Sequence, residues 1–106
     1  MSNGIRSFDK KTVLVTILLP HHYMASKFLE ELVTYTDGFT ATESSGEWWD
    51  NGIQYREPIT RVEALCSPTD AFYIRNLLPE WAEKLDQKVL LAWESDVVPH
   101  FSKGVN

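Results

Sequence analysis

The strongest turn signal in this 106-residue chain is the Asp50-Asn51-Gly52 segment near its centre. Asn-Gly favours the left-handed backbone of a two-residue hairpin turn. The flanking segments Phe39–Trp48 and Ile53–Ser67 are therefore predicted to pair as antiparallel strands. Pro58 has no N–H group to give to a ladder, so it predicts an irregularity or a free edge in the first half of the second strand.

A strand and a helix are predicted before this hairpin. Thr12–Leu19 is β-branched and apolar at both odd and even positions, which is typical of a central strand. Pro20 ends that strand, and a helix is expected to start with the His21-His22-Tyr23 segment. Asp37-Gly38 is the expected stop of the helix.

A second helix and a last strand are predicted after the hairpin. Ser67-Pro68-Thr69-Asp70 is a helix-start cluster, and Pro79 inside the helical pattern predicts a kink or a break. Lys88–Trp93 is a short apolar run that predicts the last strand. The strand after Pro58 is expected to bury one set of alternating side chains, namely Val62, Ala64 and Cys66.

The order β-α-β-β-α-β predicts an α+β fold of the ferredoxin-like type, with a four-stranded antiparallel sheet and two helices on one face. Residues 1–106 are expected to form a single domain, with 1–11 and 97–106 as loose tails. The helices can cover only one face of the sheet. Several large side chains are therefore expected on the bare face: Tyr55, Ile59, Leu65, Leu91 and Trp93. Such a face predicts self-association into a homo-oligomer.

Composition excludes several classes of function. Cys66 is the only cysteine, which excludes an intrachain disulfide and a multi-cysteine metal site. The net charge is −5 without a basic run, which argues against nucleic acid as a partner. The longest apolar run, Val13–Leu19, is far shorter than the roughly 20 residues of a membrane-spanning helix, and no signal peptide is expected. The chain is expected in the cytoplasm, away from membranes, and without a metal or cofactor.

Two carboxylates are candidates for chemistry. Tyr55 and Glu57 share a strand face if the strand is regular, and a phenol beside a carboxylate can hold an ammonium or sulfonium group. The alternative is an ordinary surface ion-pair strand. Glu94 ends the last apolar run, where sheets often place ligand contacts, although a solvated carboxylate is the common outcome.

Four other residues are weaker candidates. Trp48 in the hairpin tip can lie over a cationic ligand, or it can simply pin the turn. Glu43 is either a buried carboxylate or one that faces an edge. His21 and His22 can join Cys66 at a metal, but a role in the loop before the helix is the more common one.

The whole chain resembles two groups of proteins. Loosely, it resembles the PII/CutA-like proteins, which are small ferredoxin-like trimers with a long hairpin and ligand clefts between subunits. More narrowly, it resembles the phage-encoded S-adenosylmethionine (SAM) lyases, formerly called SAM hydrolases. That similarity runs from about Val13 to Glu94 and is carried by VLVT, TESSG, Tyr55-Arg56-Glu57 and KVLLAWES.

The narrower resemblance implies cleavage of SAM into 5′-methylthioadenosine and L-homoserine lactone, which counters host restriction-modification in the bacterial cytoplasm. It implies a homotrimer with sites between subunits. Glu57, Glu94 and Tyr55 would be the catalytic residues. The implied substrate-binding residues are Pro20, His21, His22, Glu43 and Trp48.

Three alternatives remain open at this stage. Glu57 or Glu94 can serve as a base that activates water, which would make the enzyme a hydrolase. The chain can instead be a non-catalytic PII-like module that binds a small ligand and signals through its hairpin. A CutA-like metal-binding trimer is the third possibility.

Overall fold

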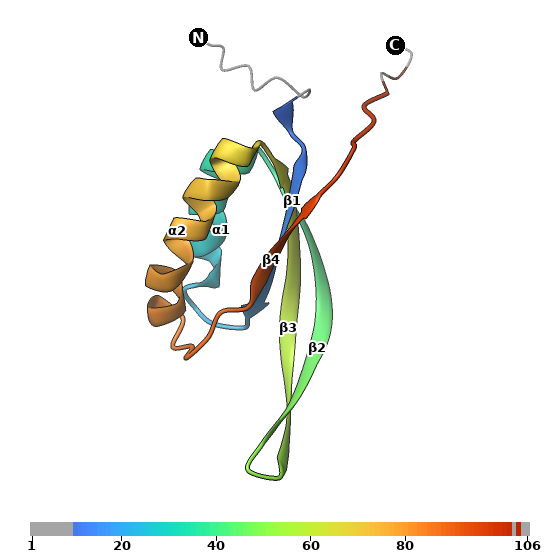
Figure 1. Ribbon diagram of the computed structural model, residues 1–106. Coiled ribbons are helices and arrows are strands. Elements are labelled where there is room, and N and C mark those ends of the chain that lie inside the picture. Colours follow the sequence, from blue (N-terminus) through green and yellow to red (C-terminus); the bar gives the residue numbers. More distant parts are fainter. Residues whose placement is uncertain (1–9, 103, 105–106) are drawn as a thin grey trace.

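The computed structural model describes residues 10–102 and 104, and one antiparallel sheet runs through the length of the molecule (Figure 1). The elements are β1 (Val13–Pro20), α1 (Ala25–Thr36), β2 (Thr40–Asp50), β3 (Ile53–Cys66), α2 (Pro68–Lys84) and β4 (Ala92–Asp96). The strand order is β2-β3-β1-β4, and both helices lie on one face. The predicted ferredoxin-like α+β fold is confirmed.

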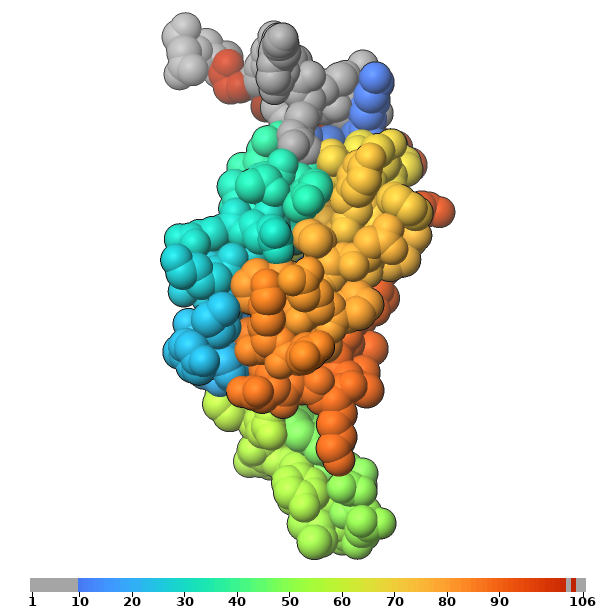
Figure 2. Space-filling model, turned by 90° about the vertical axis from the view of Figure 1, so that its left-hand side faces the viewer, coloured from blue at the N-terminus to red at the C-terminus, as the bar shows by residue number. Residues whose placement is uncertain are grey.

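The core lies between the sheet and the helices. Residues that face each other across an antiparallel pair point to the same side, and Val15 and Ile17 lie opposite Ala64 and Val62. All four are buried, as the alternation after Pro58 predicts. The helices contribute Phe28, Leu32, Ile74, Trp81 and Leu85 to the same core. Figure 2 shows the outer surface of this helix layer, with the hairpin extending past its lower end.

Local signals set the ends of several elements. Asn51 and Gly52 have φ angles of 51° and 78°, the left-handed conformation that the Asn-Gly pair predicts. The Ser67 hydroxyl accepts a hydrogen bond of 3.1 Å from the Asp70 N–H, so the predicted start of α2 is confirmed.

The β2–β3 hairpin is longer than the rest of the sheet. β1 ends where Pro20 pairs with Ile59, so Pro58 and the residues before it pair only with β2. This portion of β3 has an open edge where β1 would continue, which is the setting that tolerates a proline. The hairpin therefore projects as two strands beyond the helices (Figure 1).

Three sequence predictions about boundaries are wrong. The last strand is Ala92–Asp96 instead of Lys88–Trp93, because the preceding residues form the connection that leads back from α2. Its approach to β1 begins with the Leu18 N–H bonded to the Leu91 carbonyl, at 3.0 Å. The helix α1 begins at Ala25, later than the predicted start at His21.

The third correction concerns Pro79: α2 continues through it, so the predicted break is wrong, and the alternative of a kink stays a prediction. Trp81 and Leu85, beyond the proline, are buried, and the Trp81 ring contacts Phe28 edge-on at 5.4 Å. Packing of the second half of the helix against α1 therefore outweighs the cost of an internal proline, which is about 3 kcal/mol.

The predicted loose tails lie partly outside the described residues, which omit 1–9, 103, 105 and 106. Within the described part, Lys11 is buried. Its ammonium donates hydrogen bonds of 3.1 Å to the Thr36 carbonyl and to Asp37 Oδ2. In residues 10–102 and 104, no helix is long and apolar enough to cross a membrane.

Candidate functional site

The projecting hairpin carries an aromatic pair on its bare face. Trp48 and Tyr55 are opposite one another, and their rings stack with centroids 6.4 Å apart and planes inclined by 17°. Both are about two-fifths exposed. The next pair on the same face is Gly46 with Glu57, followed by Ser44 with Ile59. We call Trp48, Tyr55, Glu57 and Ile59 the hairpin strip.

Glu57 is an unusual carboxylate for this chain. It is partly buried, and it makes no hydrogen bond or ion pair with any described residue. Two of the three other partly buried carboxylates among residues 10–102 have a hydrogen-bond partner, since Glu31 contacts Trp81 and Asp70 bonds Ser67. Glu63 has only Arg61 nearby, at 3.8 Å, which is beyond hydrogen-bond length. Glu57 is the partly buried carboxylate that has neither a hydrogen bond nor an ion pair with a described residue.

Gly46 leaves space beside this carboxylate. A Cβ built at Gly46 would be 3.4 Å from the Trp48 ring and 3.7 Å from Ile59, which is ordinary contact. The space above Gly46 is therefore about the size of one methyl group and is bounded by the Trp48 ring and Ile59. Gly46 is the last residue of the TESSG segment, and the sequence assigned it no role of its own.

The opposite face of the hairpin is closed by a polar cluster. Glu47 Oε1 accepts hydrogen bonds from Gln54 Nε2 and Arg56 Nη2, both at 2.9 Å, and from Arg56 Nε at 3.3 Å. Arg56 lies directly opposite Glu47 in the register. The Arg56 guanidinium thus bonds Glu47 on the face of the hairpin that lies away from Glu57.

A second cluster lies at the base of the hairpin. His21 Nε2 is 2.9 Å from Glu43 Oε2, and the Thr60 hydroxyl donates to Glu43 Oε1 at 3.1 Å. The structure thus joins two predicted substrate-binding residues. Glu43 is exposed, which excludes the buried alternative and leaves the edge-facing one. Pro20 lies nearby, opposite Ile59.

His22 is held in a structural contact. Its Nδ1 accepts a hydrogen bond of 3.0 Å from the Met24 N–H, so Nε2 carries the proton that bonds Asp86 Oδ2 at 2.9 Å. This arrangement ties the turn before α1 to the end of α2. Within the described residues, no three His, Cys, Asp or Glu side chains are grouped so as to hold a metal ion.

Glu94 lies away from the hairpin strip. It pairs with Val15, which pairs with Ala64, so it faces the helices, whereas Glu57 faces the bare side. Seven residues separate Ala64 from Glu57 along β3, roughly 23 Å at the rise of a strand. The structure does not bring Glu94 and Glu57 together within one chain.

An ion pair occupies Glu94. Arg75 Nε and Nη2 donate to its two oxygens at 2.7 and 2.8 Å. These hydrogen bonds, with the guanidinium charge, lower the pKa of the Glu94 carboxyl below its usual value and outweigh burial, which acts to raise it. The pair borders a cavity of about 190 Å³ between α2 and β4, lined also by Ile74, Leu78 and Trp93.

Comparisons with known proteins identify the architecture. No protein-family model and no curated protein sequence matches the chain. Among solved structures, a point mutant of CutA1 from Pyrococcus horikoshii OT3 matches with a TM-score of 0.66 and 14% identity, over 84% of this chain and 86% of that one. CutA1 of Shewanella sp. SIB1 matches with a TM-score of 0.66 and 18% identity, over 89% of this chain and 88% of that one. The chain has the fold of the CutA1 proteins.

The same fold includes an enzyme. A phage SAM lyase in complex with S-methyl-5′-thioadenosine matches with a TM-score of 0.59 and 11% identity, over 87% of this chain and 86% of that one. Identities this low establish the shared CutA1 fold alone. These matches therefore do not show which residues of this chain hold a ligand.

Proposed function

We propose that this chain degrades SAM as a lyase, with the hairpin strip as the part of the site that holds the sulfonium and the α-ammonium. The observation that carries the proposal is Glu57, the partly buried carboxylate without a partner among the described residues. It lies on the same face as the stacked Trp48 and Tyr55. A carboxylate beside aromatic faces suits a ligand with two cationic centres.

The reaction makes few demands on the protein. The α-carboxylate of SAM attacks its own γ-carbon, the bond from that carbon to sulfur breaks, and the electron pair leaves with the neutral thioether of 5′-methylthioadenosine. The other product is homoserine lactone. The nucleophile is already ionised and the leaving group needs no proton. Holding the folded-back conformer in a dry site is therefore the main contribution required of the enzyme.

Each residue of the hairpin strip has a role in this proposal. Glu57 accepts hydrogen bonds from the α-ammonium, and the Trp48 and Tyr55 rings contact the sulfonium. Gly46, directly opposite Glu57, places no side chain between this carboxylate and the substrate. Pro20 and His21, at the base of the hairpin, border the same end of the sheet, and we assign the adenosine to that region. Glu94 is bonded to Arg75 on the other face, so this proposal gives it no part in the reaction within one chain.

A second copy of the chain completes the proposed site. The hairpin strip is open in a single copy, and an exposed apolar strip favours association. The outer edge of β2 is also unpaired over Thr40–Asp50, and long bare edges readily pair with another chain. We propose a homotrimer in which a neighbour covers the hairpin strip and excludes water.

The test is to incubate the purified chain with SAM and to follow 5′-methylthioadenosine, homoserine lactone and homoserine by mass spectrometry at early times. We expect lactone to precede homoserine. Glu57→Gln should lower kcat/KM on the order of a hundredfold, because a charged partner of the ammonium is lost. The matched control is Glu83→Gln, which removes an exposed carboxylate on α2 and should retain activity.

Two outcomes would contradict the proposal. Full activity in Glu57→Gln would remove this residue from the site. If SAM stays intact, the proposed lyase activity is excluded. A rise in melting temperature with SAM that is bound but not consumed would then favour a non-catalytic ligand-binding module.

A further inference from the structure

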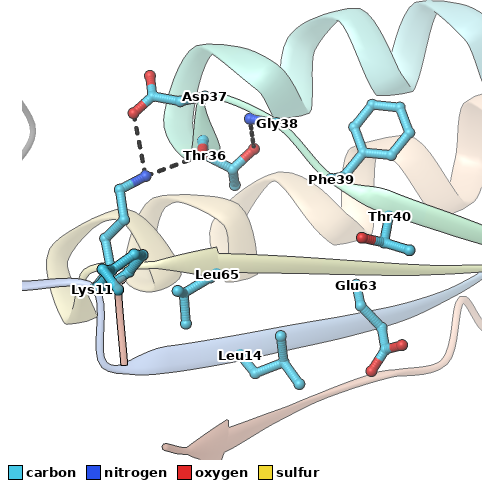
Figure 3. A pocket seen from close by; sticks show the side chains of 10 residues that line it. Lys11, Leu14, Thr36, Asp37, Gly38, Phe39, Thr40, Glu63 and Leu65 are labelled. Carbon is cyan, nitrogen blue, oxygen red and sulfur yellow. Dashed lines mark hydrogen bonds and ion pairs between the residues drawn. The ribbon is translucent and has the colours of Figure 1, made fainter. Parts of the chain in front are cut away.

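An open groove of about 510 Å³ lies at the end of the sheet away from the hairpin tip (Figure 3). Its floor includes Leu14 and Leu65, which pair across β1 and β3 on the bare face. Phe39 and Phe101 contribute aromatic rings to its lining. The remaining lining residues are Lys11, Thr36, Asp37 and Gly38, near the end of α1, and Thr40 and Glu63, on the β2–β3 pair.

The two ends of this groove differ in charge. Near α1 the Lys11 ammonium already bonds the Thr36 carbonyl and the Asp37 carboxylate, both at 3.1 Å, and its side chain is only 8% exposed. That end is therefore neutral overall, and its cation is occupied. Lys11 is the one basic residue among the described residues that line the groove, so these residues offer an anionic ligand no free positive charge.

The other end of the groove presents free acceptors. Glu63 lies opposite Thr40, and the Thr40 hydroxyl makes no hydrogen bond with any described residue. The nearest cation to Glu63 is Arg61, with Nε at 3.8 Å, which is beyond hydrogen-bond length. The Arg61 guanidinium also lies over the Trp93 ring, 5.5 Å from its centroid. The Glu63 carboxylate thus retains most of its capacity to accept hydrogen bonds.

We propose that this groove is a binding site for a small organic cation. The ammonium would bond Glu63 and the Thr40 hydroxyl, and the apolar body would lie on Leu14 and Leu65 beside the two phenyl rings. The volume is in the range of small-ligand sites, and the net charge of −5 favours a cation over an anion. Six residues separate Glu63 from Glu57 along β3, roughly 20 Å, so the inference is independent of the proposed SAM reaction.

Three probes that share one body test this inference. 2-Phenylethylammonium, 2-phenylethanol and 3-phenylpropionate are titrated into the full chain, with affinity measured by calorimetry and location by methyl and aromatic NMR shifts. We expect the ammonium probe to bind about tenfold tighter than the alcohol, since it adds a charge-assisted hydrogen bond. The carboxylate probe should bind weakest. Shifts should be confined to the methyl and aromatic groups that line the groove, namely Leu14, Leu65, Phe39 and Phe101.

Variants locate the charge that is responsible. Glu63→Gln should remove the preference for the ammonium probe while leaving alcohol binding unchanged, and Thr40→Val should weaken it to a smaller extent. Glu83→Gln removes an equal charge from α2 and should change nothing. Equal affinities for ammonium and alcohol, an undiminished preference in Glu63→Gln, or shifts away from the groove would each overturn the proposal. So would failure of the ammonium probe to bind at millimolar concentration.

Discussion

Gly46 lies directly opposite Glu57 in the β2–β3 hairpin, so the position facing the unpaired carboxylate has no side chain. We predict opposite effects of Gly46→Ala on stability and on ligand binding. Alanine should stabilise the strand by roughly 0.5–1 kcal/mol, since glycine loses more backbone entropy on folding. The new methyl group would fill the gap between Trp48 and Ile59. It should therefore raise KM for SAM, or weaken SAM binding, about tenfold.

Urea unfolding and substrate titration measure these two effects on one preparation. A drop in stability would mean that the methyl group strains the hairpin. Unchanged SAM affinity together with raised stability would show that the ligand does not enter beside Glu57.

The Glu47–Arg56 ion pair should slow the local opening of the projecting part of the hairpin. We predict that Arg56→Gln speeds amide hydrogen exchange in the projecting part of the hairpin about two- to fivefold, the range expected for an exposed ion pair. Amides where β3 pairs with β1, such as that of Val62, should exchange unchanged. The matched control is Lys27→Gln, which breaks an ion pair within α1. Equal acceleration throughout the sheet would contradict a local role for this pair.

Gly52 occupies the left-handed position of the turn, with φ at 78°. Gly52→Ala should destabilise the hairpin by about 1 kcal/mol, because a Cβ is disfavoured in this conformation. Gly38→Ala is the control, since its Cβ would meet no atom within 4 Å and its φ is not in that region. Hydrogen-exchange rates of the Trp48 and Tyr55 amides measure this loss of stability. Equal rates in Gly52→Ala and Gly38→Ala would rule out strain at the turn.

Glu94 should contribute a pH-dependent part of the stability. Its pKa in the folded chain lies below the usual 4.5, so its ionised form is favoured by folding. That contribution is complete above pH 4.5 and is lost as the pH falls through the lowered folded value. The urea midpoint of the wild type should exceed that of Glu94→Gln at about pH 7, and the two should converge towards about pH 3. A difference that is independent of pH would contradict the role of the Arg75–Glu94 pair.

Much of the fold follows from local signals that the sequence states directly. The alternation of apolar residues at Val62, Ala64 and Cys66 predicts one buried face of the strand. The Asn51-Gly52 pair predicts a turn with a left-handed backbone that few other residues adopt. The bare face was predictable for a related reason. Two helices cannot cover both sides of a sheet, so Tyr55 and Trp93 remain exposed on the other side.

Other features depend on register, which local patterns do not encode. Whether Glu94 shares a face with Glu57 depends on the pairing of β4 with β1 and of β1 with β3. A shift of one residue in either pairing would have reversed the answer. The last strand was predicted at Lys88–Trp93 but lies at Ala92–Asp96. A short apolar run is equally compatible with a strand and with a connection that covers the core, so its composition does not distinguish the two.

The candidate site was predicted in part. Tyr55 and Glu57 share a face, as their spacing predicts, and the register of the hairpin adds Trp48 to that face. The contributions of Gly46 and Arg75 were missed, because an empty position and a partner from α2 are visible only once the strands and helices are placed together.

β3 is one continuous strand of 14 residues whose upper half lines the buried core and whose lower half carries Tyr55 and Glu57. No hinge or loop separates the two halves. Substitutions at buried positions such as Val62 or Ala64 would therefore act on the same strand that carries Tyr55 and Glu57 of the proposed site. A change in ligand specificity in this part of β3 would therefore have to be compatible with the packing of the core residues on the same strand.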